Sequence, residues 1–305
     1  MTQFPICDLR SVDFEVPDLA AAEAFYTEVW GLSCWKRETG SVWLHGAGDD
    51  AYLLGLHAGA APVIRSMTFR ASSAEDLQHI AARLPSHGAE LVRPIGALTD
   101  DPAGGVGLTL LDPRRRAIRI VHGDERRPAD PPAKDRPERL AHVNINSVDV
   151  DADVDMFVDL LGFRLTDRSK MMGFVRTNAD HHSVVIAQAS ANTLNHVAFL
   201  LPSWEGVMRA SGRLVDHGFD IAWGVGRHGP GDNVFAYFID PFGFVVEHTA
   251  EVLQVDDDYV VRYPEHWVWP KGRTDQWGIA PPKSDACKSA QLAIPFKDQQ
   301  IAGSD

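Results

Sequence analysis

Apolar residues recur along the chain as short strand-like runs that alternate with stretches of helical spacing. The segment 9–32 predicts a strand, then a capped helix that stops at Gly31. The apolar residues of this helix are Leu19, Ala22, Tyr26 and Val29. The segment 140–163 repeats the pattern 131 residues later, with a helix that stops at Gly162. Its apolar residues are Val154, Phe157, Leu160 and Leu161. The chain therefore contains an internal repeat.

The repeat extends over most of the chain. A predicted strand and helix at 66–88 match 195–218, and two strands joined by an Asp-Pro turn at 105–123 match 233–251. Each half thus predicts two units of approximately βαβββ type, whose sheets pair into a half-open barrel with a concave interior. We expect an α+β fold of two tandem domains, each made of paired βαβββ modules, with a C-terminal tail.

Composition between and after the halves marks the expected domain boundaries. Residues 124–139 are rich in proline and charged residues and predict a linker. We therefore expect an N-terminal domain at 1–123, a C-terminal domain at 140–252 and a C-terminal extension at 253–305. The extension belongs to neither repeat.

Two histidines and one glutamate stand at strand positions of the second half. They are His142, His196 and Glu247, and the corresponding residues of the first half are Ser11, Ser66 and Arg119. A lone histidine on a strand is more often structural than a ligand. That interpretation does not explain why all three repeat-related positions carry ligand types in one half only. Two imidazoles and a carboxylate on one face of a metal leave positions open, which favours Fe(II) oxygen chemistry, and Mn(II) accepts the same ligands.

Bulk composition excludes several classes of protein. The 305 residues are 45% hydrophobic, enough for a sizeable core, and no apolar run is long enough for a membrane span. The N-terminus lacks a secretory signal, and the three cysteines are far apart, so we expect a soluble cytoplasmic protein with reduced thiols. A net charge of −13 argues against nucleic acid or an anionic membrane as a partner.

Three segments carry a resemblance to a known family: HVN at 142–144, NHVAF at 195–199 and GRHGPGDNVFAYFIDPFGFVVEHTAE at 226–251. Together with the tandem modules, they resemble the type I extradiol ring-cleaving dioxygenases of the vicinal oxygen chelate superfamily. The resemblance covers about residues 9 to 252. It implies a first domain without metal that supports the fold, and a second that binds Fe(II) through His142, His196 and Glu247. It also implies a catechol-type substrate, O2 as co-substrate and a homo-oligomer.

The resemblance further implies roles for residues around the metal. It places the acid/base histidine at His182, with His181 as the alternative, because only one of two successive strand side chains faces the cavity. Tyr237 is similar to the family tyrosine that donates a hydrogen bond to the catecholate oxygen, and His228 to a histidine near the substrate. Asn144 resembles an amide near the dioxygen site. His248 is expected to face away from the metal.

Other functions remain open on sequence grounds. An oxygenase of aromatic keto acids uses the same ligand types, although the GRH…Y signature and the short tail disfavour it. A metal-free, drug-sequestering binding protein uses the same modules. A glyoxalase-like isomerase is disfavoured because its sites draw on two carboxylates and on both paired modules. Trp267, Trp269 and Trp277 of the extension predict a packed strap over the barrel mouth or an oligomer contact, and a strap would narrow the pocket.

Overall fold

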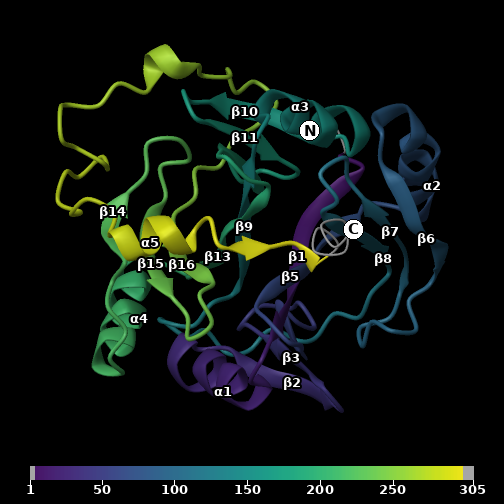
Figure 1. Ribbon diagram of the computed structural model, residues 1–305, viewed down its shortest axis with the longest axis horizontal. Helices are drawn as coiled ribbons and strands as arrows, with labels where there is room; N and C mark the ends of the chain where they lie inside the picture. The colour runs from purple at the N-terminus through teal and green to yellow at the C-terminus, as the bar shows by residue number, and fades with distance from the viewer. Residues whose placement is uncertain (1–3, 298–305) are drawn as a thin grey trace.

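The computed structural model describes residues 4–297 and contains two mixed β-sheets in tandem (Figure 1). The first sheet is 8-stranded, with the strand order β2-β3-β4-β1-β5-β8-β7-β6. Its strands are β1 (Ile6–Val16), β2 (Ser33–Glu38), β3 (Ser41–His45), β4 (Leu54–Ala58), β5 (Val63–Ala71), β6 (Glu90–Ala97), β7 (Val106–Leu111) and β8 (Ala117–His122). Its helices are α1 (Leu19–Ala24), which continues as a π-helix over Phe25–Trp30, and α2 (Ala74–Arg83), which is followed by a 3₁₀ turn at Pro85–His87.

The second sheet repeats this topology in the order β10-β11-β12-β9-β13-β16-β15-β14. Its strands are β9 (Arg139–Ser147), β10 (Arg164–Arg168), β11 (Met172–Arg176), β12 (Val184–Gln188), β13 (Thr193–Leu200), β14 (Trp223–Arg227), β15 (Val234–Ile239) and β16 (Val245–Ala250). Its helices are α3 (Val150–Asp155), which continues as a π-helix over Met156–Leu160, and α4 (Trp204–Asp216). In both sheets an antiparallel central pair, β1 with β5 and β9 with β13, joins two βαβββ units. The predicted α+β architecture of paired modules is therefore confirmed.

The first helix of each half begins and ends for the same physical reasons. The Asp18 and Asp149 carboxylates cap the N-termini by accepting hydrogen bonds from the Ala21 and Ala152 amides, at 3.0 and 3.2 Å. After each helix the chain turns through a glycine with positive φ, 100° at Gly31 and 75° at Gly162. Glycine adopts this left-handed conformation without the steric cost of a Cβ, so the predicted stops are confirmed.

The two halves share one hydrophobic core. Phe14 of β1 stacks on Phe244, with ring centroids 3.9 Å apart, and the Tyr26 hydroxyl donates a 2.9 Å hydrogen bond to the Asp240 carboxylate. Trp30 stacks on His248 of β16 at 3.7 Å between ring centroids. The first half thus packs against the face of the second sheet that is opposite to the concave interior of that sheet.

The tail runs back over the second sheet, and its described part reaches the region between the halves, as the yellow segment of Figure 1 shows. It contains a 3₁₀ turn, η4 (Pro264–His266), then α5 (Asp285–Ala290) and β17 (Ile294–Pro295), which pairs with the start of β13. Across the described residues no helix is both long and apolar enough to cross a membrane.

Candidate metal centre

The three predicted ligands lie on adjacent strands of the second sheet. His142 is on β9, His196 on β13 and Glu247 on β16, and β13 lies between the other two. In the strand register Ala198 of β13 pairs with both His142 and Glu247. His196 is two residues from Ala198, and alternate residues of a strand share a face. The three side chains therefore point into the same concave interior.

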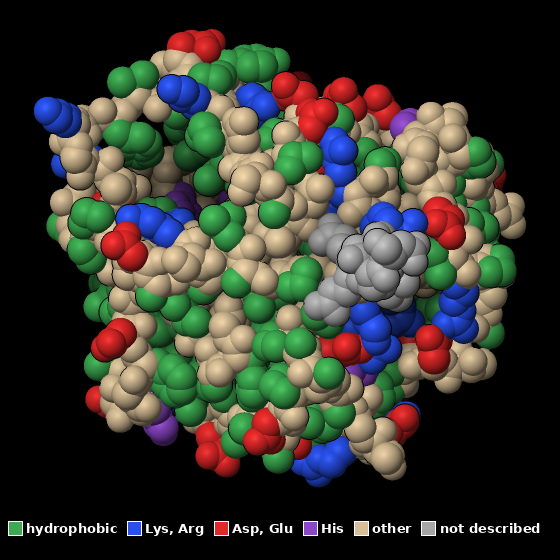
Figure 2. Space-filling model, in the orientation of Figure 1, with side chains coloured by type: hydrophobic (Ala, Val, Ile, Leu, Met, Phe, Trp, Pro, Cys, Tyr) green, Lys and Arg blue, Asp and Glu red, His purple; other side chains and the backbone are tan. Residues whose placement is uncertain are grey.

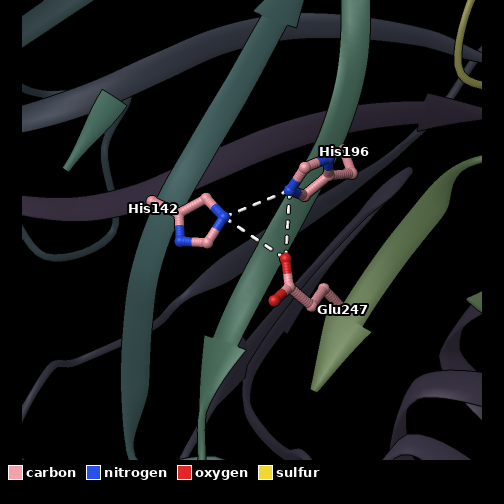
Figure 3. A group of neighbouring side chains, drawn as sticks. All are labelled: His142, His196 and Glu247. Atoms are coloured by element: carbon pink, nitrogen blue, oxygen red, sulfur yellow. Dashed lines mark hydrogen bonds and ion pairs between the residues drawn. The ribbon is translucent and has the colours of Figure 1, made fainter. Parts of the chain in front are cut away.

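The three ligand atoms converge on one point (Figure 3). His142 Nε2 and His196 Nε2 are 3.1 Å apart, and they lie 3.3 and 3.0 Å from Glu247 Oε2. Ligands that bind a metal at about 2.1 Å and at right angles are about 3.0 Å apart, whereas tetrahedral ligands are about 3.4 Å apart. The spacing therefore fits one triangular face of an octahedral metal, with three further positions open.

Electrostatics favour the ligand forms of these groups. Burial alone would raise the pKa of Glu247, but the two imidazoles beside it hold that pKa well below its ordinary value, so the carboxylate is ionised. Burial lowers the pKa of His196 to about 4, which leaves its imidazole neutral at pH 7. A neutral imidazole and a carboxylate each present a lone pair to a divalent cation.

Neighbouring amides fix the orientation of the ligands. The Nδ1 atom of His196 lies 2.8 Å from Asn195 Oδ1, an oxygen that also accepts a 2.7 Å hydrogen bond from Gln291 Nε2 of the tail. Since Asn195 Oδ1 can only accept, the His196 proton is on Nδ1 and Nε2 is free for a metal. On the other side, Asn233 Nδ2 donates to Glu247 Oε1 at 3.4 Å and to Thr249 at 2.8 Å.

Replacement of Gln291 by leucine is therefore expected to weaken metal binding by about 10- to 100-fold, the usual effect of losing a partner that orients a ligand. The measurement is competition with a chelator of known affinity. The control is Gln188→Leu, because Gln188 is exposed at the end of β12. Equal metal affinities of the two variants would exclude an orienting role for Gln291.

The metal face opens into a cavity of about 340 Å³. The predicted site residues that line it are His142, Asn144, His182, His196, His228 and Tyr237. Glu247 lies beneath them with 0% exposure. Figure 2 shows a hollow in this part of the surface, bordered by hydrophobic side chains, with histidine atoms visible inside it. All seven predicted site residues thus lie at one location, and His248 points the other way, against Trp30, as expected.

His182 faces the cavity and His181 lies behind it. The His182 ring centroid is 4.4 Å from that of His142. Its Nδ1 atom is 3.0 Å from His181 Nδ1, and His181 Nε2 is 2.8 Å from the buried Asp167 carboxylate. Burial, followed by the charges of His142 and His181, holds the pKa of His182 well below its ordinary value of 6.5. The ring is therefore neutral at pH 7 and able to accept a proton. No motif or spacing in the chain indicates that Asp167 is the partner of His181.

Tyr237, His228 and Asn144 form the rest of the polar wall. The Tyr237 hydroxyl lies 3.0 Å from His228 Nε2, and the His228 ring stacks on Phe235 at 4.0 Å between ring centroids. Burial and the nearby Glu247 raise the pKa of Tyr237 well above its ordinary value, so its hydroxyl stays protonated. Asn144 Oδ1 is buried without a hydrogen-bond partner among residues 4–297. An unpartnered buried oxygen of this kind is available to a bound molecule.

Comparison with known proteins identifies the family. The model of the glyoxalase/bleomycin resistance protein/dioxygenase superfamily matches this chain twice, over residues 9–118 and 139–248. The chain belongs to this superfamily. It is 28% identical to metapyrocatechase 2 of Cupriavidus necator, over 87% of this chain and 85% of that protein. It is 26% identical to 3-methylcatechol 2,3-dioxygenase of Pseudomonas putida, over 86% of this chain and 96% of that protein.

A solved structure from the same superfamily is similar over nearly the whole length. The Mn(II)-bound glyoxalase from Novosphingobium aromaticivorans matches with a TM-score of 0.87 and 30% sequence identity, covering 93% of this chain and 94% of that chain. The fold over 93% of this chain is therefore shared with that Mn(II)-bound protein.

The two superfamily modules of this chain differ at the ligand positions, as the sequence predicts. In the first module the Ser66 hydroxyl donates to the Asp13 carboxylate at 3.3 Å, and Arg119 lies 3.3 Å from Asp101. Within residues 4–297 the only group of three or more potential ligand side chains is that of the second module. The first module therefore contributes packing and no metal site to the described structure.

Two of the three tryptophans in the tail of this protein line the cavity. Trp267 and Trp269 form part of the cavity wall beside Gly229. Trp277 lies further out, where the Arg227 guanidinium is 5.2 Å from its ring centroid. The tail thus forms part of the cavity rim, as the strap hypothesis expects, with Trp267 half-buried and Trp269 37% exposed.

Proposed function

We propose that the protein is an Fe(II)-dependent extradiol dioxygenase that cleaves a substituted catechol-type ring with O2. The main support is geometric, because three ligand atoms fit one face of an octahedral metal whose open side meets a cavity containing a neutral buried base, His182. The names of the Cupriavidus and Pseudomonas relatives agree with this activity. On this proposal residues 140–252 are the catalytic domain and residues 1–123 support it.

A divalent metal held by His142, His196 and Glu247 would supply Lewis acidity toward two vicinal hydroxyls and an electron path to dioxygen. The remaining work falls to side chains of this chain. His182 accepts the proton of a catechol hydroxyl and later returns it. Because His182 Nδ1 already faces His181, the nitrogen left for the substrate is Nε2. Because His181 Nε2 faces the Asp167 carboxylate, His181 Nδ1 accepts a hydrogen bond from His182 Nδ1–H, which holds the His182 ring in position.

Tyr237, His228 and Asn144 orient the reactants in this proposal. The Tyr237 hydroxyl, 3.0 Å from His228, donates a hydrogen bond to a catecholate oxygen and His228 keeps the hydroxyl in place. Asn144 offers its amide to the open side of the metal face, where dioxygen enters. Aromatic residues line part of the cavity wall, so a substrate bound there displaces water, which strengthens each of these polar contacts.

Fe(II) is proposed as the metal because ring cleavage needs a redox-active centre beside a substrate and oxygen. The Mn(II)-bound relative makes manganese the alternative metal. The test is parallel reconstitution of metal-free protein with Fe(II), Mn(II) and Zn(II), with oxygen uptake on catechol as the readout. We expect Fe(II) to restore the highest rate and Zn(II) to restore none. Activity with Zn(II) equal to that with Fe(II) would exclude the proposed chemistry.

The name of the Novosphingobium relative raises a second candidate, a glyoxalase-type isomerase. The single carboxylate of this metal face and its location within one module argue against it. Oxygen uptake discriminates, because an isomerase consumes no oxygen. The same assay distinguishes the proposed dioxygenase from two other candidates. A metal-free binding protein would turn over no catechol, and a keto-acid oxygenase would act on an aromatic keto acid instead.

The tryptophan strap is proposed to limit the size of the ring substituent. Replacement of Trp269 by alanine is expected to raise the preference for 2,3-dihydroxybiphenyl over catechol about tenfold, because it opens the cavity wall. The measurement is the ratio of kcat/KM for the two substrates. Trp204→Ala is the control, since Trp204 is 52% exposed on α4. An unchanged ratio in Trp269→Ala would exclude the strap from substrate selection. Removal of the whole tail is a poorer test because Gln291 leaves with it.

A further inference from the structure

One cation of the tail enters the cavity wall without an acidic partner. The half-buried Lys283 places its Nζ 4.4 Å from the Trp223 ring centroid and 5.7 Å from that of Tyr237. Its one hydrogen-bond acceptor among the described residues is Gln291 Oε1, at 2.7 Å. An ammonium group has three donors, so the packing of Lys283 leaves donor capacity toward the cavity.

The cavity lining is unusually poor in negative charge. Among residues 4–297 no carboxylate lies within ion-pair distance of Lys283, and no Asp or Glu side chain lines the cavity. Lys170, on the exposed β10–β11 turn, is the other lysine of the lining. Partial burial of an ammonium without a carboxylate is costly unless a ligand supplies the counter-charge. The two nearby carboxylates are already engaged by histidines, Glu247 by His142 and His196 and Asp167 by His181.

The position of Lys283 relative to the metal face suits a ring substituent. Trp223, which Lys283 covers, lies 5.1 Å from Tyr237 and 5.3 Å from His228 between ring centroids. Tyr237 in turn lies 4.9 Å from the His196 ring. A catechol with its hydroxyls at the metal face and its ring beside Tyr237 therefore directs a substituent toward Trp223 and Lys283.

We propose that Lys283 binds an anionic substituent of the ring, so that the substrate class is a catechol carrying a carboxylate. This inference rests on the proposed function for the placement of the catechol. Burial lowers the pKa of Lys283, and a bound carboxylate offsets that shift. The aromatic faces of Trp223 and Tyr237 hold the ammonium in place between binding events.

A purely structural role for Lys283 makes a different prediction. Lys283 holds Gln291, and Gln291 holds Asn195 beside His196. If this were its only role, removal of its charge would weaken metal binding and affect every catechol alike. If it binds a carboxylate, removal of its charge affects only the anionic ligand.

The experiment compares an anionic ligand with its neutral isostere. Anaerobic calorimetric titrations of the metal-loaded protein use 3,4-dihydroxyphenylacetate and its methyl ester, for the wild type, Lys283→Met, Lys283→Arg and the control Lys170→Met. The wild type is expected to bind the acid about tenfold or more tightly than the ester, as expected for a hydrogen bond to a charged group. Lys283→Met is expected to lose this preference with its ester affinity unchanged, while Lys283→Arg and Lys170→Met keep it.

Two results would overturn the proposal. One is a wild type that binds acid and ester equally; the other is a Lys283→Met variant that loses affinity for both by the same factor. Oxygen uptake on the same two compounds separates this inference from the proposed function. Turnover of both without a preference overturns the Lys283 role and leaves the dioxygenase activity intact. Selective binding of the acid without any turnover supports the Lys283 role and contradicts the dioxygenase activity.

Discussion

Replacement of His196 by alanine is expected to abolish stoichiometric metal binding and to reduce ring cleavage by far more than 100-fold. Substitution of residues that only orient a ligand already costs up to about 100-fold, and His196 supplies one of three converging ligand atoms. The variant also removes two edges of the triangle, the 3.1 Å approach to His142 Nε2 and the 3.0 Å approach to Glu247 Oε2. Metal content by atomic absorption after Fe(II) reconstitution, together with oxygen uptake, measures both effects.

The control for His196→Ala is His217→Ala, since His217 is exposed at the end of α4 and its side chain contacts the Arg213 carbonyl oxygen, far from the three ligands in the sequence. That variant should bind one metal ion per chain and retain full activity. Circular dichroism establishes that both variants are folded. Full metal content in His196→Ala would mean that the three side chains do not form the metal site.

Replacement of His182 by asparagine is expected to reduce kcat by about 10² to 10⁴, the usual contribution of a positioned acid/base group. Metal content should stay at the wild-type level because His182 is not one of the three converging ligands. The measurement is steady-state oxygen uptake with metal content determined on the same sample. Loss of metal together with activity in this variant would contradict a role limited to proton transfer.

The pH profile of the wild type provides a second measurement of the same role. The pKa of His182 lies well below 6.5, so the neutral, proton-accepting form is present at pH 7 and is lost only as the pH falls through that lower value. The acid limb of kcat/KM is therefore expected below pH 6.5. Replacement of His181 by asparagine breaks the contact with Asp167 and should change kcat less than His182→Asn does. An equal or larger loss in the His181 variant would assign the proton transfer to His181.

The repeat explains why so much of this site could be predicted from the sequence. Strands of the two halves keep nearly the same offset along the chain, so alternation assigns His142 and His196 to the same face as Glu247. The absence of ligand types at Ser11, Ser66 and Arg119 then distinguishes the two modules. Local periodicity also predicts the helix stops, because both require a glycine in the left-handed region.

Residues that reach the site through long-range packing could not be predicted from the repeat or from strand alternation. Asp167 is on β10 and reaches His181 across the sheet, and Gln291 and Lys283 come from a tail with no counterpart in the first half. Periodicity cannot indicate where an irregular segment returns to the fold. The same reason explains why the sequence left open whether the tryptophans form a strap over the barrel mouth or an oligomer contact.

The first half of the chain supports the metal centre by packing against the back of β16. Its aromatic residues Phe14 and Trp30 stack directly on Phe244 and His248, and His248 is the immediate neighbour of Glu247. A rigid back face limits the movement of β16 and keeps the carboxylate aimed at the two histidines. Loss of metal ligands from the first module is therefore compatible with its retention as a support.

The most direct test of the central claim is anaerobic reconstitution with Fe(II), followed by simultaneous recording of oxygen uptake and visible absorbance on a panel of catechols with and without a carboxylate. We expect one O2 consumed for each catechol and a yellow ring-opened product, with no activity in His196→Ala. A protein that binds no metal and turns over no catechol in this panel would contradict the account and leave the buried histidines with a structural role.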